Sequence, residues 1–425
     1  MDQPATRIVI AGGGAAGFFA AIACAEALAA KPGPAARVFI YESTGYPLTK
    51  VRISGGGRCN VTNACTEPRL LVKNYPRGGR ELIGPLHRWG PRETVEWFAA
   101  RGVALRAEPD GRMFPVTDDS QTIIDCLQHA ARAAGVEVIT HHGIAAASRR
   151  PAGGFDLTLT SGGTVACDRL LIATGGNAAS PGLAIARSLG HAIEPPVPSL
   201  FTFQFEDPRL GGLAGLAVER TVVRVVDTAL REEGPLLITH WGVSGPAILR
   251  LSAWGARELA AREYRFKLRV NFAPPHTRDS LVKELAAVRE KNPRKQVTTW
   301  CPVALPLRFW ERLVAAAGLA PTAPWTTLSN AALGALAAQV TEAEFAVVGK
   351  STNKEEFVTC GGVRLREVDF HTMQSKLCPG LHFAGEVLDI DGITGGFNFQ
   401  AAWTTGWIAG QALADTGHAA PPASP

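Results

Sequence analysis

Runs of hydrophobic residues near the start of the chain predict a strand, a helix and a second strand. Residues 7–10 (RIVI) and 37–41 (RVFIY) are short runs rich in β-branched and aromatic residues. Between them, three glycines at residues 12–14 turn the chain, and residues 15–30 are largely apolar and favour a helix. This pattern indicates a βαβ unit with parallel strands.

The hydrophobic spacing changes twice further along the chain. Residues 155–168 alternate like a hairpin, and residues 169–173 form a solid apolar run that is typical of a buried parallel strand. Strand-like segments then follow at residues 200–206, 218–227, 236–239 and 264–270. Between residues 279 and 340 apolar residues recur every three or four positions, which indicates helices. A strand at 381–384 and an apolar helix at 401–413 resemble the first domain more than their neighbours.

Composition is that of a globular chain of two or three domains. Of 425 residues 46% are apolar, and the net charge of +5 is spread without long runs of one sign. We therefore expect neither a nucleic acid nor a membrane as partner. Residues 8–30 resemble a secretory signal, but consecutive glycines and Glu26 interrupt them.

Cysteine usage indicates a reducing compartment. Eight cysteines are scattered along the chain, without a CxxC pair or a histidine at metal-ligand spacing. We expect no metal site and no disulfide framework. Free thiols are typical of the cytoplasm, and we expect the protein there.

A glycine fingerprint lies between the first strand and the first helix. In Gly12-x-Gly14-x-x-Gly17 the first glycine permits the turn, the second lets a pyrophosphate approach, and the third lets helix and sheet pack closely. The helix start offers unpaired N–H groups to the phosphates. Glu42 closes the second strand, where a carboxylate accepts ribose hydroxyls and repels a 2′-phosphate. The alternative is a structural glycine loop with a surface glutamate.

The segment SGGGRCNVTN at residues 54–63 is unusually rich in glycine and hydrogen-bond donors. Such a loop is suited to wrapping a ligand, with donors from Arg58, Asn60 and Thr62. A plain surface loop is the alternative. Cys59 is either a redox group or, as single cysteines more often are, a buried thiol.

A second helix start follows the glycines at residues 395–396. In a flavoprotein, such an end aimed at the pyrimidine edge of the ring stabilises the negative charge that develops on reduction. Glu386, Asp389 and Asp391 precede it, and they are either ribitol ligands or turn residues.

Taken together, these segments resemble a known family. The residues that carry the resemblance are SGGGRCNVTN at 54–63, GRMFP at 111–115, ATGG at 173–176, THWGVSGPAIL at 239–249, TCGGV at 359–363, TMQSK at 372–376 and AGEVLDIDGITGGFNFQAAWTTGWIAG at 384–410. They look like the bacterial NAD(P)/FAD-dependent oxidoreductases that include 3-dehydro-bile-acid delta(4,6)-reductase and aminoacetone-oxidase-like flavoproteins. The resemblance spans nearly the whole chain.

The resemblance implies an α/β fold in which a Rossmann-like FAD-binding domain is split between the chain ends. A β-barrel-like domain and a small helical domain are inserted into it. The expected boundaries are 1–194 and 357–415 for the FAD-binding domain, 195–275 and 344–356 for the β-rich substrate domain, 276–343 for the helical insertion, and 416–425 for a disordered tail.

The resemblance also implies the residues of an FAD site. Those expected to hold the ADP half are Gly12, Gly14, Ala16, Gly17 and Glu42. Those expected along the ribitol and ring are Arg58, Cys59, Asn60 and Thr62, with Thr174 and Gly175 near the pyrophosphate. Those expected at the other edge of the flavin are Gly385, Glu386, Gly396, Phe397 and Asn398. The chain departs from the family around Lys50, whose role is therefore open, and at Phe397, where many relatives have tyrosine.

The function implied is hydride transfer between flavin N5 and a small or medium organic substrate, with reduction of an activated alkene by NAD(P)H as the leading reaction. Only one dinucleotide fingerprint is present, so a nicotinamide donor would visit the flavin transiently. The alternatives are an oxidase that uses O2, and a flavin-binding protein without turnover. His240 is the candidate proton donor; equally, it could order its turn through backbone hydrogen bonds.

Overall fold

Strands from both ends of the chain form one sheet, in the order β20–β21–β22–β10–β1–β2–β6. Its parallel strands are β1 (Thr6–Ala11), β2 (Ala36–Tyr41), β6 (Glu137–Ile139), β10 (Arg169–Ile172) and β22 (Leu381–Phe383). Val9 lies opposite Phe39 on one side and Leu170 on the other, and Leu170 lies opposite Leu381. The solid apolar runs of the sequence are thus the central strands, buried on both faces.

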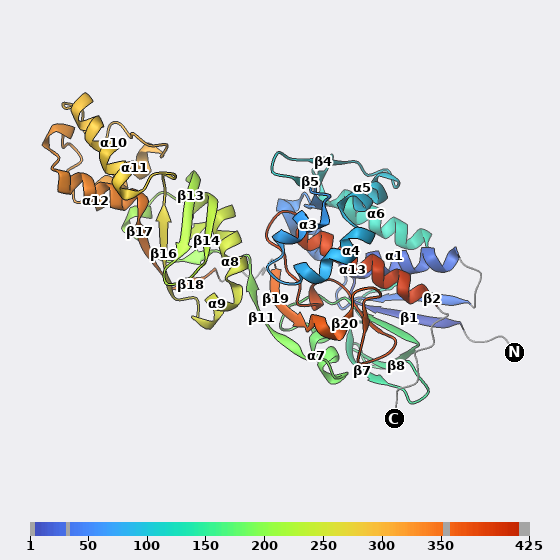
Figure 1. Cartoon of the computed structure of the whole chain (residues 1–425). Coiled ribbons are helices and arrows are strands. Elements are labelled where there is room, and N and C mark those ends of the chain that lie inside the picture. The colour runs from blue at the N-terminus through green and yellow to red at the C-terminus, as the bar shows by residue number, and fades with distance from the viewer. Residues whose placement is uncertain (1–4, 31–34, 352–357, 416–425) are drawn as a thin grey trace. The chain divides into compact units, whose positions relative to one another are not determined.

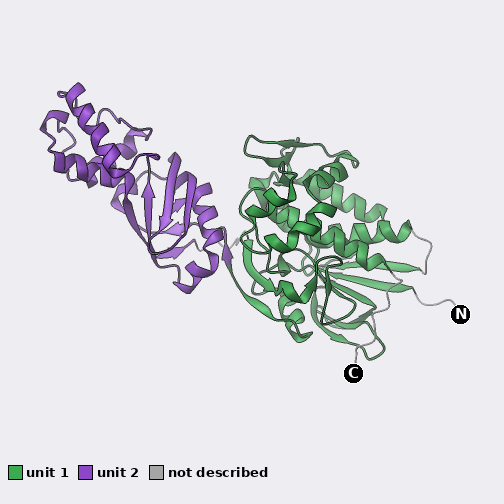
Figure 2. Cartoon of the chain, viewed as in Figure 1, with its two compact units in different colours: residues 1–197, 358–425 green, residues 198–357 purple. Residues whose placement is uncertain are grey.

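The computed structural model describes residues 5–30, 35–351 and 358–415. The chain forms two compact units, one of residues 1–197 and 358–425 (unit 1) and one of residues 198–357 (unit 2) (Figure 2). The tail expected at 416–425 lies outside the described residues. Residues 352–356, the end of the segment expected at 344–356, also lie outside the described residues.

Two helices from opposite ends of the chain pack together on the sheet of unit 1. They are α1 (Ala15–Ala29) and α13 (Phe397–Ala414), which lie side by side in Figure 1. Both are rich in small residues, and 11 of the 15 residues of α1 are buried. A Cβ on Gly406 would lie 2.7 Å from the Ala16 carbonyl oxygen, and one on Gly410 would lie 2.4 Å from that of Ala20. The backbones therefore touch only because both positions lack a side chain.

Smaller elements complete unit 1. The helices are α2 (Thr49–Ile53), α3 (Pro68–Leu71), α4 (Gly79–Arg88), α5 (Pro91–Ala99), α6 (Ser120–Ala133) and α7 (Pro181–Ser188). One antiparallel sheet has β3 (Thr62–Asn63), β5 (Arg112–Pro115) and β4 (Leu105–Ala107), and another has β7 (Ile144–Arg149), β8 (Phe155–Leu159) and β9 (Thr164–Cys167). The edge of the main sheet is β20 (Val368–Asp369) and β21 (Gln374–Ser375), and β11 (Ile193–Ser199) pairs with β19 (Val358–Val363).

Unit 2 contains an antiparallel sheet that closes on itself. Its order is β17–β16–β13–β14–β15–β12–β18. The bounds are β12 (Phe203–Gln204), β13 (Ala217–Val225), β14 (Arg231–Thr239), β15 (Gly242–Ser244), β16 (Phe266–Asn271), β17 (Ala343–Val347) and β18 (Gly349–Lys350). The two ends of this row are β17, which pairs with β16, and β18, which pairs with β12. Because only Val348 separates β17 from β18 in the chain, the row of strands forms a ring. The expected β-barrel-like domain is confirmed.

The helices of unit 2 share the core of this barrel. They are α8 (Pro246–Trp254), α9 (Ala256–Ala261), α10 (Arg278–Lys291), α11 (Leu307–Ala316) and α12 (Asn330–Thr341). Trp310 of α11 belongs to the same buried cluster as Val223 of the barrel. The rings of Phe272 and Phe309 meet edge to face at 4.8 Å between centroids. The helical insertion and the barrel therefore form one packed body.

Two of the predicted elements differ from the structure. The strand expected at 200–206 is reduced to β12, because Leu200 has a left-handed φ of 58° that interrupts an extended backbone. The helix expected from residue 401 begins at Phe397, directly after the glycines. The helices between residues 64 and 154 carry no equally strong signal and were not predicted.

The close packing of α1 and α13 can be tested with Gly410→Ala. Its methyl group would collide with the Ala20 carbonyl oxygen, so the helices must separate. We expect the free energy of unfolding, measured in urea, to fall by about 1–3 kcal/mol. The matched control is Gly334→Ala in α12, where the only neighbour within 4 Å is Arg278 Nη2 at 3.7 Å. That substitution should leave stability unchanged or raise it; equal losses in both variants would contradict the packing argument.

Candidate cofactor site

In the glycine loop before α1, the backbone geometry requires glycine at two positions but not at a third. Gly12 has a φ of +110°, and a Cβ there would lie 2.5 Å from the Ala173 carbonyl oxygen. A Cβ on Gly17 would lie 2.0 Å from the Gly12 carbonyl oxygen. Gly14 has a φ of −85°, and nothing lies within 4 Å of its Cβ position. The space beside Gly14 is therefore open, as a cradle for a closely approaching phosphate would be.

Glu42 lies where the fingerprint expects an acid, directly after β2. Its Oε2 accepts the N–H of Gly13 at 2.8 Å, and its Oε1 accepts the N–H of Thr44 at 2.8 Å. These bonds fix the carboxylate beside the glycine loop. In this position the Glu42 carboxylate can also accept hydrogen bonds from the hydroxyl groups of a ribose, as the spacing predicts.

The loop at 54–63 docks onto the start of α13. The Thr62 hydroxyl donates to Gln400 Oε1 at 2.6 Å, and a Cβ on Gly396 would lie 2.2 Å from the Thr62 carbonyl oxygen. With its amide oxygen turned toward α13, Asn60 accepts the Gly396 N–H at 2.9 Å. The indole N–H of Trp403 donates to the Val61 carbonyl at 2.9 Å. Segments more than 300 residues apart are thus joined at one point.

The two helix starts point the same way. Gly406 lies level with residues 16–20 and Gly410 with residues 20–24, so α1 and α13 are parallel. At 1.5 Å per residue, the α13 start at Phe397 lies about 9 Å beyond the α1 start at Ala15. Two partial positive charges, offset along one line, can face the phosphates and the ring of one elongated nucleotide.

The side chains of Arg58 and Cys59 interact with other residues of unit 1. The Arg58 guanidinium lies 4.0 Å from the Phe114 ring centre and pairs with Glu108 at 2.8 Å and Asp118 at 3.6 Å. Cys59 is fully buried, and burial raises the pKa of its thiol to about 12, against a smaller opposing effect of a hydrogen bond with Ser54. The thiolate needed for a nucleophile is therefore scarce at neutral pH, which favours the buried-thiol interpretation.

The residues expected near the pyrophosphate follow β10. The Thr174 hydroxyl accepts a hydrogen bond from Ser180 at 2.7 Å. Gly175 has a φ of +80°, and no atom lies within 4 Å of its Cβ position. Like Gly14, Gly175 leaves open space.

The residues expected at the far edge lie between the end of β22 and the first turn of α13. Gly385 has a φ of +74°, and its Cβ position is 2.8 Å from the Ala16 Cβ. Glu386 Oε2 lies 2.5 Å from Lys50 Nζ of α2. The Asn398 amide is bonded to both backbone groups of Gly392, so it braces the loop before α13.

Three contacts at this edge were missed by the sequence analysis. Lys50 pairs with Glu386, and Arg77 pairs with the buried Asp391. The Tyr75 hydroxyl donates to the Phe397 carbonyl at 2.7 Å. Asp391 is thereby committed to an internal ion pair. No local signal could have found these partners, because each pair is separated by more than 300 residues.

His240 lies in unit 2, in the turn between β14 and β15, and it is exposed. The structure does not relate this turn to the glycine loops of unit 1. Its role as proton donor stays a prediction.

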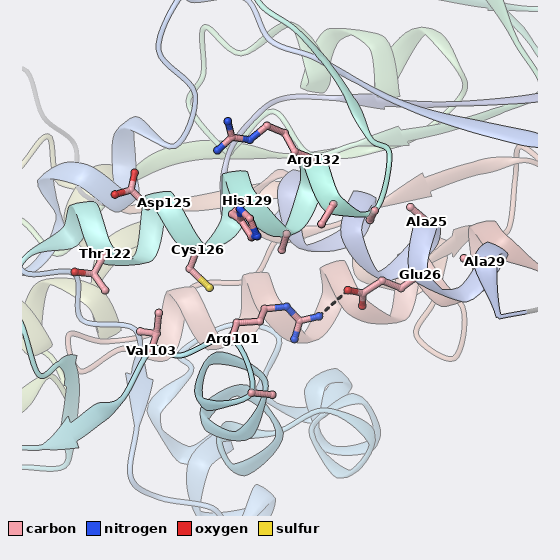
Figure 3. A pocket seen from close by; sticks show the side chains of 14 residues that line it. Ala25, Glu26, Ala29, Arg101, Val103, Thr122, Asp125, Cys126, His129 and Arg132 are labelled. Atoms are coloured by element: carbon pink, nitrogen blue, oxygen red, sulfur yellow. Dashed lines mark hydrogen bonds and ion pairs between the residues drawn. The ribbon is translucent and has the colours of Figure 1, made fainter.

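A separate groove of unit 1 lies elsewhere. It has a volume of about 1080 Å³ and runs between α1, α6 and the segment after α5 (Figure 3). Arg101 and Glu26 form an ion pair across it at 2.6 Å, and burial raises the pKa of Cys126 there to about 11. None of the expected cofactor residues lines it. The expected cofactor residues therefore lie away from this groove.

Comparison with known proteins places the chain in a family. The model of the HI0933-like protein Rossmann domain matches residues 6–412. This chain belongs to the HI0933-like family. The match confirms the expected Rossmann-type fold and the predicted class, an FAD-dependent oxidoreductase.

Two relatives of this HI0933-like protein cover nearly its whole length. The ribosomal RNA dihydrouridine synthase of Escherichia coli (strain K12) is 32% identical over 95% of this chain and 97% of its own. The 3-dehydro-bile acid delta(4,6)-reductase of Clostridium scindens is 30% identical over 96% of this chain and 99% of its own. A 3-ketosteroid-delta4-(5alpha)-dehydrogenase from Rhodococcus jostii RHA1 has the same fold, with a TM-score of 0.53 at 15% identity, and covers 96% of this chain and 97% of its own.

The described residues also bear on the expected absence of a membrane partner and of a metal site. None of the helices in residues 5–30, 35–351 and 358–415 combines the length and apolar character of a membrane span. The same ranges hold no cluster of three or more His, Cys, Asp and Glu residues suited to a metal ion. The expected absence of a nucleic-acid partner stays a prediction.

The open space at Gly14 gives a direct test of the cofactor site. Gly14 is the N-cap of α1 and has an ordinary φ, so Gly14→Ser should leave the urea unfolding of the apoprotein unchanged or slightly improved. The added side chain occupies the space that a pyrophosphate would need. We expect the Kd for FAD, measured by fluorescence titration, to rise at least about tenfold, which is a loss of about 1.4 kcal/mol in binding free energy. Unchanged FAD affinity in a folded Gly14→Ser protein would exclude this loop as the phosphate site.

Proposed function

We propose that this protein reduces a carbon–carbon double bond conjugated to a carbonyl group, with FAD as its cofactor and NAD(P)H as the electron donor. The proposal rests on one observation, the parallel and offset starts of α1 and α13 beside open space at Gly14. The names of two relatives support the reaction class. One forms dihydrouridine from a base whose double bond is conjugated to a carbonyl, and the other reduces a 3-oxo compound at positions 4 and 6.

Residues of this chain would hold the cofactor in an extended form. The N–H groups at the start of α1 would bind the pyrophosphate, and Glu42 would accept the ribose hydroxyls. The start of α13 would face the pyrimidine edge of the ring and stabilise negative charge there. Bound FAD supplies hydride transfer at N5. Lys50 would hold the Glu386 carboxylate in place near that edge.

The first candidate substrate is a uridine base in RNA, because the relative at 32% identity is a ribosomal RNA dihydrouridine synthase. The second candidate is a steroid-like dienone, favoured by the relative at 30% identity. Both are reduced by the same net addition of a hydride and a proton. The choice between them therefore depends on what binds outside the flavin site.

An anaerobic reductant screen tests the reaction. The purified protein should show flavin absorbance, which NADH or NADPH should bleach. Mixing the reduced protein with uridine-containing RNA, or with a 3-oxo-4,6-diene steroid, should restore the absorbance and give a product that has gained two hydrogens. Rapid bleaching by an amine and restoration only by O2 would instead indicate the oxidase. Bleaching by neither reductant would favour a flavin-binding protein without turnover.

The role of His240 is tested in the same assay. If His240 supplies the proton, His240→Gln should slow substrate reduction by about 10²–10⁴-fold, the usual contribution of a general acid. Bleaching by NAD(P)H needs no such proton and should keep its wild-type rate. A wild-type rate of substrate reduction in the variant would remove His240 from the mechanism.

A further inference from the structure

A row of arginines crosses the outside of the barrel in unit 2. Strands β14, β13 and β16 are neighbours, and their register places Arg231 opposite Arg224 and Arg224 opposite Arg269. Neighbouring strands lie about 4.8 Å apart, so the three positions fall within about 10 Å. Like charges directly opposite each other destabilise a sheet. This arrangement is therefore unfavourable unless something neutralises it.

The protein neutralises only one end of this row. Arg269 Nε donates to Glu344 Oε1 at 2.9 Å, and Glu344 lies opposite it on β17. The hydrogen bond from Arg269 lowers the pKa of Glu344, and the charge of Arg224 adds to the effect. Within the described part of unit 2, residues 198–351, the side chains of Arg224 and Arg231 are exposed and form neither a hydrogen bond nor an ion pair. Two positive charges of the row are therefore left for a partner.

The row lines a groove of about 420 Å³. Five arginines and only two glutamates line this groove. Arg220 pairs with Glu233 at 2.8 Å, and Arg278 lies 4.0 Å from Glu342. Arg278 is also the first residue of α10, a 14-residue helix whose N-terminal dipole adds further positive potential. Because Arg269 is paired with Glu344, the excess positive charge of the groove is concentrated at Arg224 and Arg231.

We propose that this arginine groove binds the phosphate backbone of the RNA that carries the substrate base. Guanidinium groups bind phosphate oxygens through paired hydrogen bonds, and backbone contacts position a nucleic acid without reading its sequence. One phosphate would occupy part of the row, whereas a chain of phosphates can neutralise all of it. The inference rests on the proposed function for the choice of RNA. It contradicts the expectation from composition, because the sheet register concentrates arginines that are dispersed along the sequence.

The test measures binding of end-labelled poly(U) by fluorescence anisotropy over a series of salt concentrations. Each lost phosphate contact should reduce the slope of log K against log salt by about 0.7. Arg224→Gln with Arg231→Gln should therefore weaken binding at least about tenfold at low salt and reduce the slope by about 1.4. The matched control is Arg294→Gln with Arg312→Gln. These arginines are also exposed, carry the same charge and do not line the groove.

Three results would overturn the proposal. They are equal weakening in the groove and control variants, no binding of poly(U) by the wild type, and equally tight binding of polyglutamate or anionic lipid vesicles. Folding is checked by urea unfolding, whose midpoint should stay or rise in the groove variant because repulsion is relieved. Reduction of free uridine by the groove variant should match the wild type. Absence of that reduction in the wild type itself would count against the proposed reaction and not against the groove.

Discussion

The close approach of α1 and α13 is the constraint on which the rest of unit 1 depends. At Gly406 and Gly410 one backbone touches the other, and a single methyl group would push the helices apart. Because the contact is so close and the helices are parallel, their starts are set at a fixed offset. The glycine loop and the loop at 54–63 each attach to one of these starts, so the geometry of the candidate site follows from this one packing contact.

The same region distributes charge in a way that suits a redox cofactor. Two acidic groups near the helix starts already have partners. Glu42 accepts a hydrogen bond from the Gly13 N–H, and Asp391 forms an ion pair with Arg77. The nearby thiol of Cys59 is kept protonated by burial. The described residues around these helix starts thus offer backbone dipoles and fixed hydrogen bonds, and Cys59 stays a thiol, which leaves the chemistry to the bound group.

Local sequence signals predicted the framework and missed the long-range partners. The GxGxxG loop, the apolar strands and the start of the barrel domain were predictable because each depends on residues close together in the chain. Arg58 was expected at the cofactor, and its ion pairs with Glu108 and Asp118 depend on how β5 and its neighbours fold. The arginine row was invisible for a related reason. Arg224 and Arg269 are 45 positions apart, and only the strand register brings them together.

The order of synthesis gives the split domain a further consequence. Unit 2 is continuous from residue 198 to 357 and emerges from the ribosome before α13 exists. The N-terminal part of unit 1 is therefore incomplete at this stage. The face of α1 that α13 will cover is still exposed to water. The α1 residues that contact α13 include Ala16, Ala20 and Phe19, so a nascent chain at this stage has an apolar surface that a chaperone could shield. The candidate cofactor site, which includes the start of α13, becomes complete only when this last helix docks.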